Sequence, residues 1–287
     1  MVTPSISILV LTRNERVDIE RCLQSARRLS PIIHVVDSHS TDGTSEIARA
    51  DGAVVHLGDF TSFAQKLNWA IDNIDFKTDW VMRLDADEVL SDHLVDALPR
   101  FLERQPELVS GINVRRRLWF MQRPIHFGGV YPRFSMRLWR PKKARCEMRE
   151  LDEHMMLVEG TAATIKATIE DIPLITISQW IAKHNEYSSQ EAVSAINHRI
   201  GDVSEQITPR LFGTKNERIR WIKSKLFYKI PLFMRPLLYY FYRYILMLGF
   251  LDGKSGLIFH FLHGFWYRFI VDTKIMEMQR SIHKSDN

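Results

Sequence analysis

Two carboxylates placed two residues apart, Asp85 and Asp87, have the clearest potential for chemistry in this chain. They follow directly after the apolar run 80–84. Alternate side chains of an extended segment point the same way, so the pair can hold one hard divalent cation, directly or through water. Mg²⁺ and Mn²⁺ held in this way take their other ligands from water and from a substrate diphosphate, which a nucleotide-sugar supplies. The alternative is a solvated loop that caps a helix expected from about Ser91.

A third carboxylate, Asp37, ends another apolar run, 32–37, and is followed by the polar turn 38–44. A carboxylate at this position can accept hydrogen bonds from the base or the ribose of a nucleotide. The alternative is that the whole stretch only caps the helix that follows. We interpret Asp42 as such a cap and Asp37 as a functional residue.

The elements expected around these residues place them at one edge of a sheet. Strands are expected at 5–11, 32–37, 53–57 and 80–84, and helices at 15–28, from about Ser45, and at 62–73. This alternation predicts a mostly parallel α/β sheet with helices on both faces, in which ligands bind beyond the carboxyl ends of the strands. Polar residues follow three of the four strands, at 12–15, 37–38 and 85–88. The middle of the chain, 108–170, is expected to add an antiparallel extension that covers one side of this site.

Composition indicates a globular protein with one large domain and an appendage. The 287 residues are 45% hydrophobic and 25% charged. Cys22 and Cys146 have no metal-ligand spacing, which argues against a disulfide framework or a zinc site and favours a reducing compartment. Residues 1–7 lack the basic start and apolar run of a secretory signal, so the catalytic part is expected in the cytoplasm.

The positive charge of the chain is concentrated in residues 209–287. This tail holds 14 Lys and Arg against 5 Asp and Glu, a net of +9, whereas the preceding residues carry a net of −4. The tail is also rich in apolar and aromatic residues, which favours an anionic membrane surface over a nucleic acid as its partner. Its uncharged run 255–267 is shorter than the roughly 18 to 20 residues of a spanning helix. We therefore expect interfacial helices bound peripherally to a membrane; the alternatives are packing on the catalytic domain or a contact in a homo-oligomer.

The ordered motifs Thr12-Arg13-Asn14-Glu15, 35–44 and 84–88 resemble the signature of the family 2 glycosyltransferases. The resemblance is nearest to bacterial enzymes that extend lipopolysaccharide core or exopolysaccharide chains, including the heptose β-1,4-glucosyltransferase type. Segments 159–160, 183–192 and 249–257 fit as well, so it covers nearly the whole chain. It implies a GT-A fold with a catalytic domain at 1–208, divided near residue 107 into a nucleotide-sugar half and an acceptor half, and a helical tail at 209–287.

The resemblance also implies roles for individual residues. Thr12, Asn14, Glu15 and Asp37 correspond to positions that line the nucleotide pocket. Asp85 corresponds to the aspartate that contacts ribose or diphosphate and shares the metal, and Asp87 to the direct metal ligand. Family members often carry Arg or Lys just before the Asn of the helix at 63–70, but Leu67 stands there in this chain, so we assign the neighbouring Lys66 instead.

Two further assignments concern the base and the metal. Related enzymes usually show a His-Glu pair before a short apolar run that ends in Glu-Gly; here the order is Glu153-His154, so Glu153 is the first candidate for the general base and Asp152 the second. The alternative is a salt-bridged surface turn with Arg145 and Arg149. Some relatives complete the metal site with a late histidine, which would be His184; the alternative is a structural histidine.

Together these inferences predict a Mg²⁺- or Mn²⁺-dependent inverting glycosyltransferase. The expected donor is a nucleotide-sugar, in particular a UDP-hexose. The expected acceptor is a lipid-linked lipopolysaccharide-core or exopolysaccharide saccharide at the cytoplasmic face of the bacterial inner membrane. A nucleotidyltransferase would need a glycine-rich phosphate loop after the first strand, and residues 12–15 contain no glycine. A non-catalytic membrane scaffold would leave the three acidic strand ends unexplained. The sugar, the acceptor and the linkage stay open.

Overall fold

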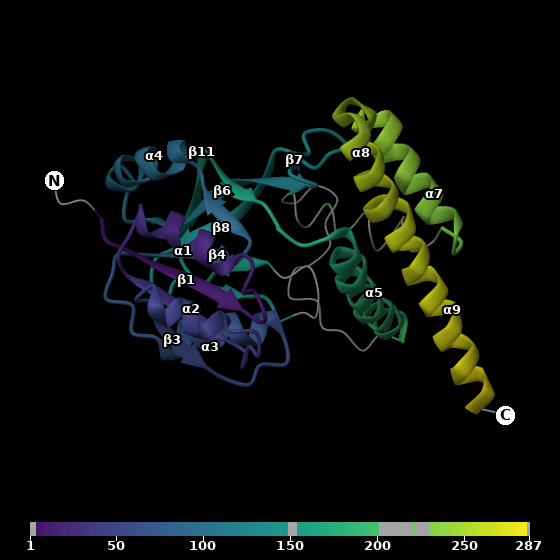
Figure 1. The fold of residues 1–287 in the computed structure, drawn as a ribbon, viewed down its shortest axis with the longest axis horizontal. Helices are drawn as coiled ribbons and strands as arrows, with labels where there is room; N and C mark the ends of the chain where they lie inside the picture. Colours follow the sequence, from purple (N-terminus) through teal and green to yellow (C-terminus); the bar gives the residue numbers. More distant parts are fainter. Residues whose placement is uncertain (1–3, 149–153, 201–217, 219–220, 222–229, 286–287) are drawn as a thin grey trace. The chain divides into compact units, whose positions relative to one another are not determined.

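The computed structural model describes residues 4–148, 154–200, 218, 221 and 230–285 (Figure 1). The chain divides into two compact units. Unit 1 comprises Met1–His126 and Val130–Ile175, and unit 2 comprises Phe127–Gly129 and Thr176–Asn287. The boundary at 175 differs from the expected one at 208 because the long helix that begins at Ile177 packs with the C-terminal helix.

Unit 1 is built on a mixed sheet of nine strands among the described residues, in the order β3-β2-β1-β4-β8-β6-β11-β5, with β7 paired to β6. The four strands expected from the sequence are parallel neighbours: β1 (Ile6–Thr12), β2 (Ile33–Asp37), β3 (Val54–Leu57) and β4 (Trp80–Asp85). In the register of these strands, Thr12 lies opposite Asp37, and Leu11 lies opposite Asp85. The three polar strand ends therefore do meet at one edge, as predicted.

The rest of the sheet comes from the middle of the chain. Its strands are β5 (Glu88–Leu90), β6 (Val109–Phe120), β7 (Arg123–Pro124), β8 (Arg133–Trp139) and β11 (Thr161–Asp171). β8 pairs antiparallel with β4 and with β6, which confirms the antiparallel extension, but β11 pairs parallel with β6. A separate antiparallel pair is formed by β9 (Ala144–Cys146) and β10 (Met155–Leu157).

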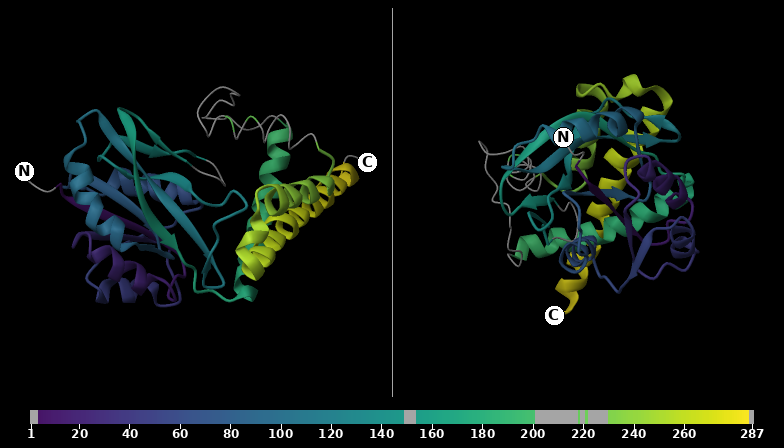
Figure 2. Two further views of the ribbon diagram at one scale, coloured as in Figure 1. Left: turned by 90° about the horizontal axis from the view of Figure 1, so that it is seen from above. Right: turned by 90° about the vertical axis from the view of Figure 1, so that its left-hand side faces the viewer.

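Helices cover both faces of this sheet, as Figures 1 and 2 show. One core cluster joins β1, β2 and β4 to α1 (Ile19–Arg27), α2 (Thr44–Ala50) and α4 (Asp92–Glu103). A second cluster joins the opposite side chains of β1, β2 and β4 to α3 (Phe63–Asn73). Alternation along β1 divides its residues between the two clusters, because Ile8 and Val10 enter the first while Leu9 and Leu11 enter the second. This is the layered α/β architecture, similar to GT-A, that the sequence predicts.

Unit 2 is helical throughout its described part, apart from short connections. It contains α5 (Ile177–Ile200), α7 (Met234–Phe241), the π-helix η2 (Tyr242–Leu246), the 3₁₀ turn η3 (Gly249–Asp252), α8 (Gly253–Phe259), the π-helix η4 (His260–Trp266) and α9 (Tyr267–Ser285). α5 packs against α9 through Ala192, Ala195, Val271 and Ile275. No single described helix is long and apolar enough to cross a membrane, but Met234–Leu246 and Gly249–Ser281 pass that test as a pair bent by 71°.

Candidate functional site

Asp37 organises the loops that follow β1 and β2. Its carboxylate is buried and accepts hydrogen bonds from the Thr12 hydroxyl at 2.7 Å, the Ser40 amide at 2.7 Å and the Ser40 hydroxyl at 2.6 Å. Burial alone would raise the pKa of Asp37, but these hydrogen bonds outweigh it and hold the pKa below its usual value. Asp37 is therefore an ionised anchor that fixes Thr12 and the start of the second loop.

Asn14 connects the same two loops from the other side. Its backbone is left-handed, with φ of 56°, a conformation that asparagine adopts more readily than most residues. Its amide donates to the Ser40 hydroxyl at 2.7 Å, and its side-chain oxygen accepts from the Thr41 amide at 2.9 Å. The Glu15 amide in turn donates to the Thr44 hydroxyl at 2.9 Å. The motif at 12–15 thus shapes the loops through hydrogen bonds that depend on its residue types.

Lys66 brings a positive charge into this edge from α3. Its ammonium group donates to the backbone oxygen of Thr12 at 2.8 Å, and the side chain is 8% exposed. Burial lowers the pKa of Lys66 to about 8, although Asp37 and Glu15 act in the opposite direction. The neighbouring Leu67 is fully buried in the core, so the helix presents Lys66, not residue 67, to the loops. Lys66 therefore lies beside the loop after β1, and its role in binding a nucleotide-sugar stays a prediction.

The Asp85-Ala86-Asp87 turn lies between β4 and β5 and is fixed at several points. The Asp85 amide donates to Glu88 Oε2 at 3.0 Å, and the backbone oxygen of Asp87 accepts from the Ile172 amide at 2.9 Å. The carboxylate of Asp85 accepts two hydrogen bonds from Arg137, each at 3.2 Å, through Oδ2 alone. Its other oxygen, Oδ1, is buried and accepts no hydrogen bond from any described residue, with Arg83 Nε at 3.5 Å.

Beneath this turn lies a buried network of charges that sequence reasoning missed. Arg137 is 1% exposed and also pairs with Glu88, which is fully buried and has Arg116 Nε at 3.4 Å. Arg116 in turn donates through Nε to Asp171 at 2.9 Å. Burial raises the pKa of Glu88 to about 7 against the effect of Arg137. The sequence offers one signal for this network, namely a glutamate at the start of an apolar strand, but none for its arginine partners.

The arginines decide the charge state of Asp85. Burial would raise its pKa, but Arg83, Arg137 and Arg116 hold the pKa of this carboxyl well below its usual range. Asp85 is therefore ionised, and its charge is compensated within the protein. Asp87, the second carboxylate of the motif, is half-buried in the same turn.

The comparisons with known proteins bear on this edge of the sheet directly. The model of the family described as Glycosyl transferase family 2 matches residues 7–172, more than half of the chain. The chain belongs to glycosyl transferase family 2. The matched region begins in β1 and ends just after β11, so it includes both the loops around Asp37 and the turn at 85–87.

Individual relatives of this family 2 glycosyltransferase match different shares of the chain. The chain is 27% identical over 194 residues to the lipopolysaccharide core biosynthesis glycosyltransferase LpsC of Rhizobium meliloti, a match that covers 65% of this chain and 70% of that protein. It is 36% identical over 98 residues to an uncharacterized glycosyltransferase of Rickettsia bellii. That match covers 34% of this chain and 33% of that protein. A solved structure of glucosyl-3-phosphoglycerate synthase from Mycobacterium tuberculosis with Mg²⁺ and UDP matches 39% of this chain and 44% of that chain, with 23% identity and a TM-score of 0.34.

The divalent metal expected for this site fits the residues present. The described residues contain no group of three or more His, Cys, Asp or Glu that could hold a metal by themselves. Mg²⁺ commonly binds through only one or two carboxylates and takes its other ligands from substrate phosphates and water. Asp87, together with the Oδ1 of Asp85 that accepts no hydrogen bond, supplies such a partial set.

The remaining predicted residues lie elsewhere. Glu153 and Asp152 fall outside the described residues, so their assignment as the base stays a prediction. His184 belongs to unit 2, where its ring stacks on Trp180 with centroids 3.5 Å apart. Its Nδ1 lies 2.9 Å from the backbone oxygen of Trp180, which places the proton there and leaves Nε2 with a lone pair. Burial lowers the pKa of His184, so the ring is neutral at pH 7, and its role as a metal ligand stays a prediction.

Asp42 has the capping role that the sequence predicts for it. Its Oδ1 accepts from the amide of Thr44, the first residue of α2, at 3.0 Å. Its Oδ2 accepts from the Arg16 amide at 3.0 Å, which ties the loop after β1 to the start of α2. The residue therefore supports the site without being part of it.

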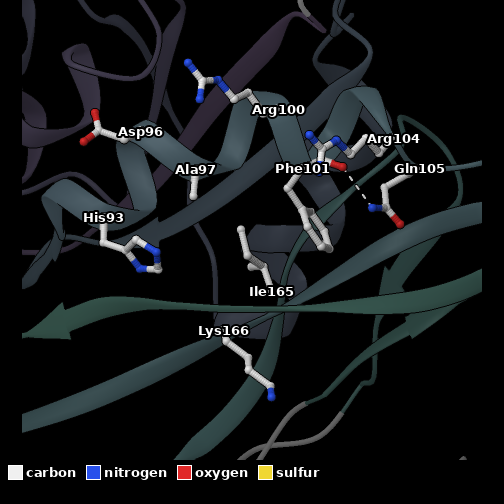
Figure 3. Close-up of a pocket in the computed structure, with 9 residues that line it drawn as sticks. All are labelled: His93, Asp96, Ala97, Arg100, Phe101, Arg104, Gln105, Ile165 and Lys166. Atoms are coloured by element: carbon white, nitrogen blue, oxygen red, sulfur yellow. Dashed lines mark hydrogen bonds between the residues drawn. The ribbon is translucent and has the colours of Figure 1, made fainter.

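A hollow of about 720 Å³ lies away from this edge, between α4 and β11. Figure 3 shows Phe101 and Ile165 facing each other across it, whereas Arg100 and Asp96 point away and Lys166 extends to the other side of the strand. Its charged groups do not converge, and none of the residues that line it belongs to the strand ends. We assign no function to it.

Proposed function

We propose that this chain is a divalent-metal-dependent, inverting glycosyltransferase that moves a hexose from a UDP-sugar to a lipid-linked saccharide of lipopolysaccharide core or exopolysaccharide. The observation that carries the proposal is the meeting of Thr12, Asp37 and Asp85 at one sheet edge, with Lys66 beside them. Family membership and the resemblance to LpsC support the reaction and the acceptor class. The basic, apolar tail supports a site of action at the cytoplasmic face of the inner membrane.

The residues at this sheet edge would bind the nucleoside, the diphosphate and the metal. The loops ordered by Asp37 and Asn14 would hold the nucleoside, and the Lys66 ammonium lies where it can neutralise part of the diphosphate. Asp87 and Asp85 would hold the divalent cation, which supplies further charge neutralisation to the leaving diphosphate. The two hydrogen bonds from Arg137 help keep Asp85 ionised and engage only Oδ2, so that Oδ1 accepts no hydrogen bond from the described residues.

The transfer itself is a single displacement. The acceptor hydroxyl oxygen forms a bond to the anomeric carbon as the bond from that carbon to the diphosphate oxygen breaks, and UDP leaves with the electron pair. A carboxylate, Glu153 or Asp152, takes the proton of the hydroxyl. Attack from the face opposite the leaving group inverts the anomeric centre.

The test of the donor side is nucleotide release from UDP-glucose, UDP-galactose, UDP-N-acetylglucosamine and a GDP-sugar, with and without Mn²⁺. We expect release from a UDP-hexose that requires the metal. Asp87→Ala should lower it at least ~100-fold, because the cation contributes several kcal/mol to the charge stabilisation of the leaving group. Asp96→Ala, on the exposed surface of α4, is the matched control. Unchanged turnover of Asp87→Ala with metal still required would contradict the assignment, and pyrophosphate release from a nucleoside triphosphate would indicate a nucleotidyltransferase instead.

The base is tested by two isosteric variants. Glu153→Gln should bind UDP-sugar as before and lose transfer, because the amide keeps the shape but accepts no proton. Asp152→Asn should stay active. The reverse pattern would move the base to Asp152, and full activity of both variants would remove it from this segment.

A further inference from the structure

The helices of unit 2 carry their apolar side chains on the outside. In η2 and the turn after it, five of the six residues from Leu246 to Leu251 are exposed large hydrophobic residues, with Leu246 at 61% and Leu251 at 52%. The two arms add further exposed side chains of the same kind: Met234, Leu237, Leu238, Phe241, Tyr242 and Ile245 on one, and Leu257, Ile258 and Phe261 on the other. An exposed apolar surface of this extent marks a membrane or protein contact.

Both arginines of the first arm are turned inward. Arg235 is 2% exposed and donates to Asp272 of α9 at 2.6 Å, and Asp272 is itself buried. Arg243 is buried and donates to the backbone oxygen of Gly128 at 2.7 Å and to the Tyr239 hydroxyl at 3.0 Å. A helix of a protein that is surrounded by water shows the opposite distribution, with apolar residues inside and charges outside. The arrangement suits helices whose surroundings are hydrocarbon.

Close packing between the two arms fits the same surroundings. A Cβ on Gly249 would come within 2.9 Å of the Arg243 oxygen, and a Cβ on Gly264 within 3.8 Å of the Tyr240 Cα. Small residues at such contacts let helices approach closely where no water drives their association. Ring contacts of Tyr240 with Phe261 and Phe265 also join the arms, while the exposed side chains stay outside.

The first arm is too short to cross a bilayer. Met234–Leu246 has 13 residues, which at ~1.5 Å per residue gives about 20 Å against the ~30 Å of a bilayer's hydrocarbon core. After residues 247–252 the chain returns beside this arm, because the rings of Tyr240 and Tyr244 contact those of Phe265 and His260. A hairpin with an arm of this length reaches into one leaflet and returns.

We infer that Met234–Trp266 is a re-entrant hairpin that inserts into one leaflet of a lipid bilayer with residues 246–251 deepest. A second copy of the chain is a poorer partner for these side chains. Consecutive exposed residues at the turn point in several directions, so one flat protein surface cannot cover them all, whereas lipid can surround them. The hairpin rests on the proposed function in one respect only, namely that its purpose would be access to a lipid-linked acceptor.

Insertion depth tests the hairpin in the full chain. Leu246→Cys and Met234→Cys would each carry an environment-sensitive dye, with Leu108→Cys of unit 1 as the control, since the native Cys22 and Cys146 are buried. With vesicles of phosphatidylethanolamine and phosphatidylglycerol, the dye at residue 246 should shift to the blue and be quenched most by a nitroxide in the middle of the acyl chain. The dye at residue 234 should be quenched most near the head groups, and the dye at 108 should not respond. Equal depths at 234 and 246 would overturn the hairpin in favour of helices lying flat.

Membrane binding is tested separately. Replacing both Leu246 and Leu251 by Glu should reduce flotation with the vesicles roughly tenfold or more, because two inserted apolar side chains are lost. Replacing Leu108 and Val158, which are similarly exposed in unit 1, by Glu should leave flotation unchanged. Equal flotation of the two double variants would refute the proposal. So would a blue shift at residue 246 that grows with protein concentration in the absence of vesicles, since it would indicate a second copy. UDP-sugar hydrolysis in solution, measured on the same variants, should stay unchanged, which separates this inference from the donor chemistry.

Discussion

Lys66 has an ammonium group poised to lose its proton just above neutral pH. Its pKa is lowered from 10.5 to about 8 by burial, so the group is mostly charged at pH 7 and mostly neutral at pH 9. If it neutralises the donor diphosphate, affinity for UDP should fall as pH rises through about 8. In Lys66→Met, affinity should be lower at pH 7 and nearly independent of pH between 7 and 9. Calorimetric titration of UDP at several pH values checks this; a wild-type affinity that stays constant over that range would contradict it.

Which site residues the sequence reveals depends on how local their signals are. Thr12, Asp37 and Asp85 could be predicted to lie together because each ends a strand that is mostly apolar, and parallel strands end at one edge. Arg137 could not be predicted, because it lies 52 residues from Asp85 in a strand whose pairing with β4 has no local signature. Lys66 was assigned from the family resemblance, but its contact with the Thr12 oxygen depends on how α3 packs, which the sequence does not show.

At the scale of elements, the buried pair of Arg137 in β8 and Glu88 in β5 joins two strands that are not neighbours in the sheet. Arg137→Met leaves Glu88 and Asp85 with less compensation, so we expect it to lower the free energy of unfolding by ~3 kcal/mol or more. The double variant Arg137→Met, Glu88→Met should recover part of that loss, because no buried charge of the pair is left alone. Both variants should transfer poorly, since Asp85 loses the group that fixes it.

Urea unfolding measures the two variants against Arg28→Met. Arg28 pairs with Asp92 at the surface, where both side chains are well exposed, and such pairs contribute ~0–1 kcal/mol. A single Arg137→Met variant as stable as Arg28→Met would show that the buried pair does not support the turn. A double variant less stable than the single one would show that Glu88 contributes through Asp171 and Arg116 instead.

Elements with a regular period were predicted better than those without one. The helix expected from Ser91 begins there, with the Ser91 hydroxyl accepting from the Leu94 amide at 3.2 Å. The middle of the chain was expected to be antiparallel, yet β11 runs parallel to β6. The chain leaves β8 and enters β11 at the same end of the sheet, and β11 then pairs with β6 instead of β8. Strand direction follows from the path of the chain in three dimensions, which alternation along a strand does not encode.

At the scale of the whole molecule, the helix α5 belongs with the C-terminal helix. The Tyr267 hydroxyl donates to Glu191 at 2.7 Å, and the Lys274 ammonium donates to the Asn185 backbone oxygen at 2.7 Å and to Ser188 at 2.8 Å. The sequence placed α5 in the catalytic part because the change to basic, aromatic helices begins only after residue 208. Contacts between segments some 80 residues apart leave no trace in composition.

This division predicts where the chain can be cut. A fragment that ends at 175 removes all of α5, α9 and the hairpin, whereas one that ends at 208 keeps α5 without the Val271 and Ile275 side chains that cover Ala192 and Ala195. The longer fragment should therefore expose an apolar helix face and associate or aggregate, and the shorter one should stay monodisperse and bind UDP. Gel filtration with light scattering, followed by UDP titration of both fragments, measures this. Both fragments lose the partners of Phe127–Gly129, so that loss cannot account for a difference between them. If the fragment ending at 208 is the better behaved of the two, α5 packs on unit 1 in solution and the boundary belongs near 208.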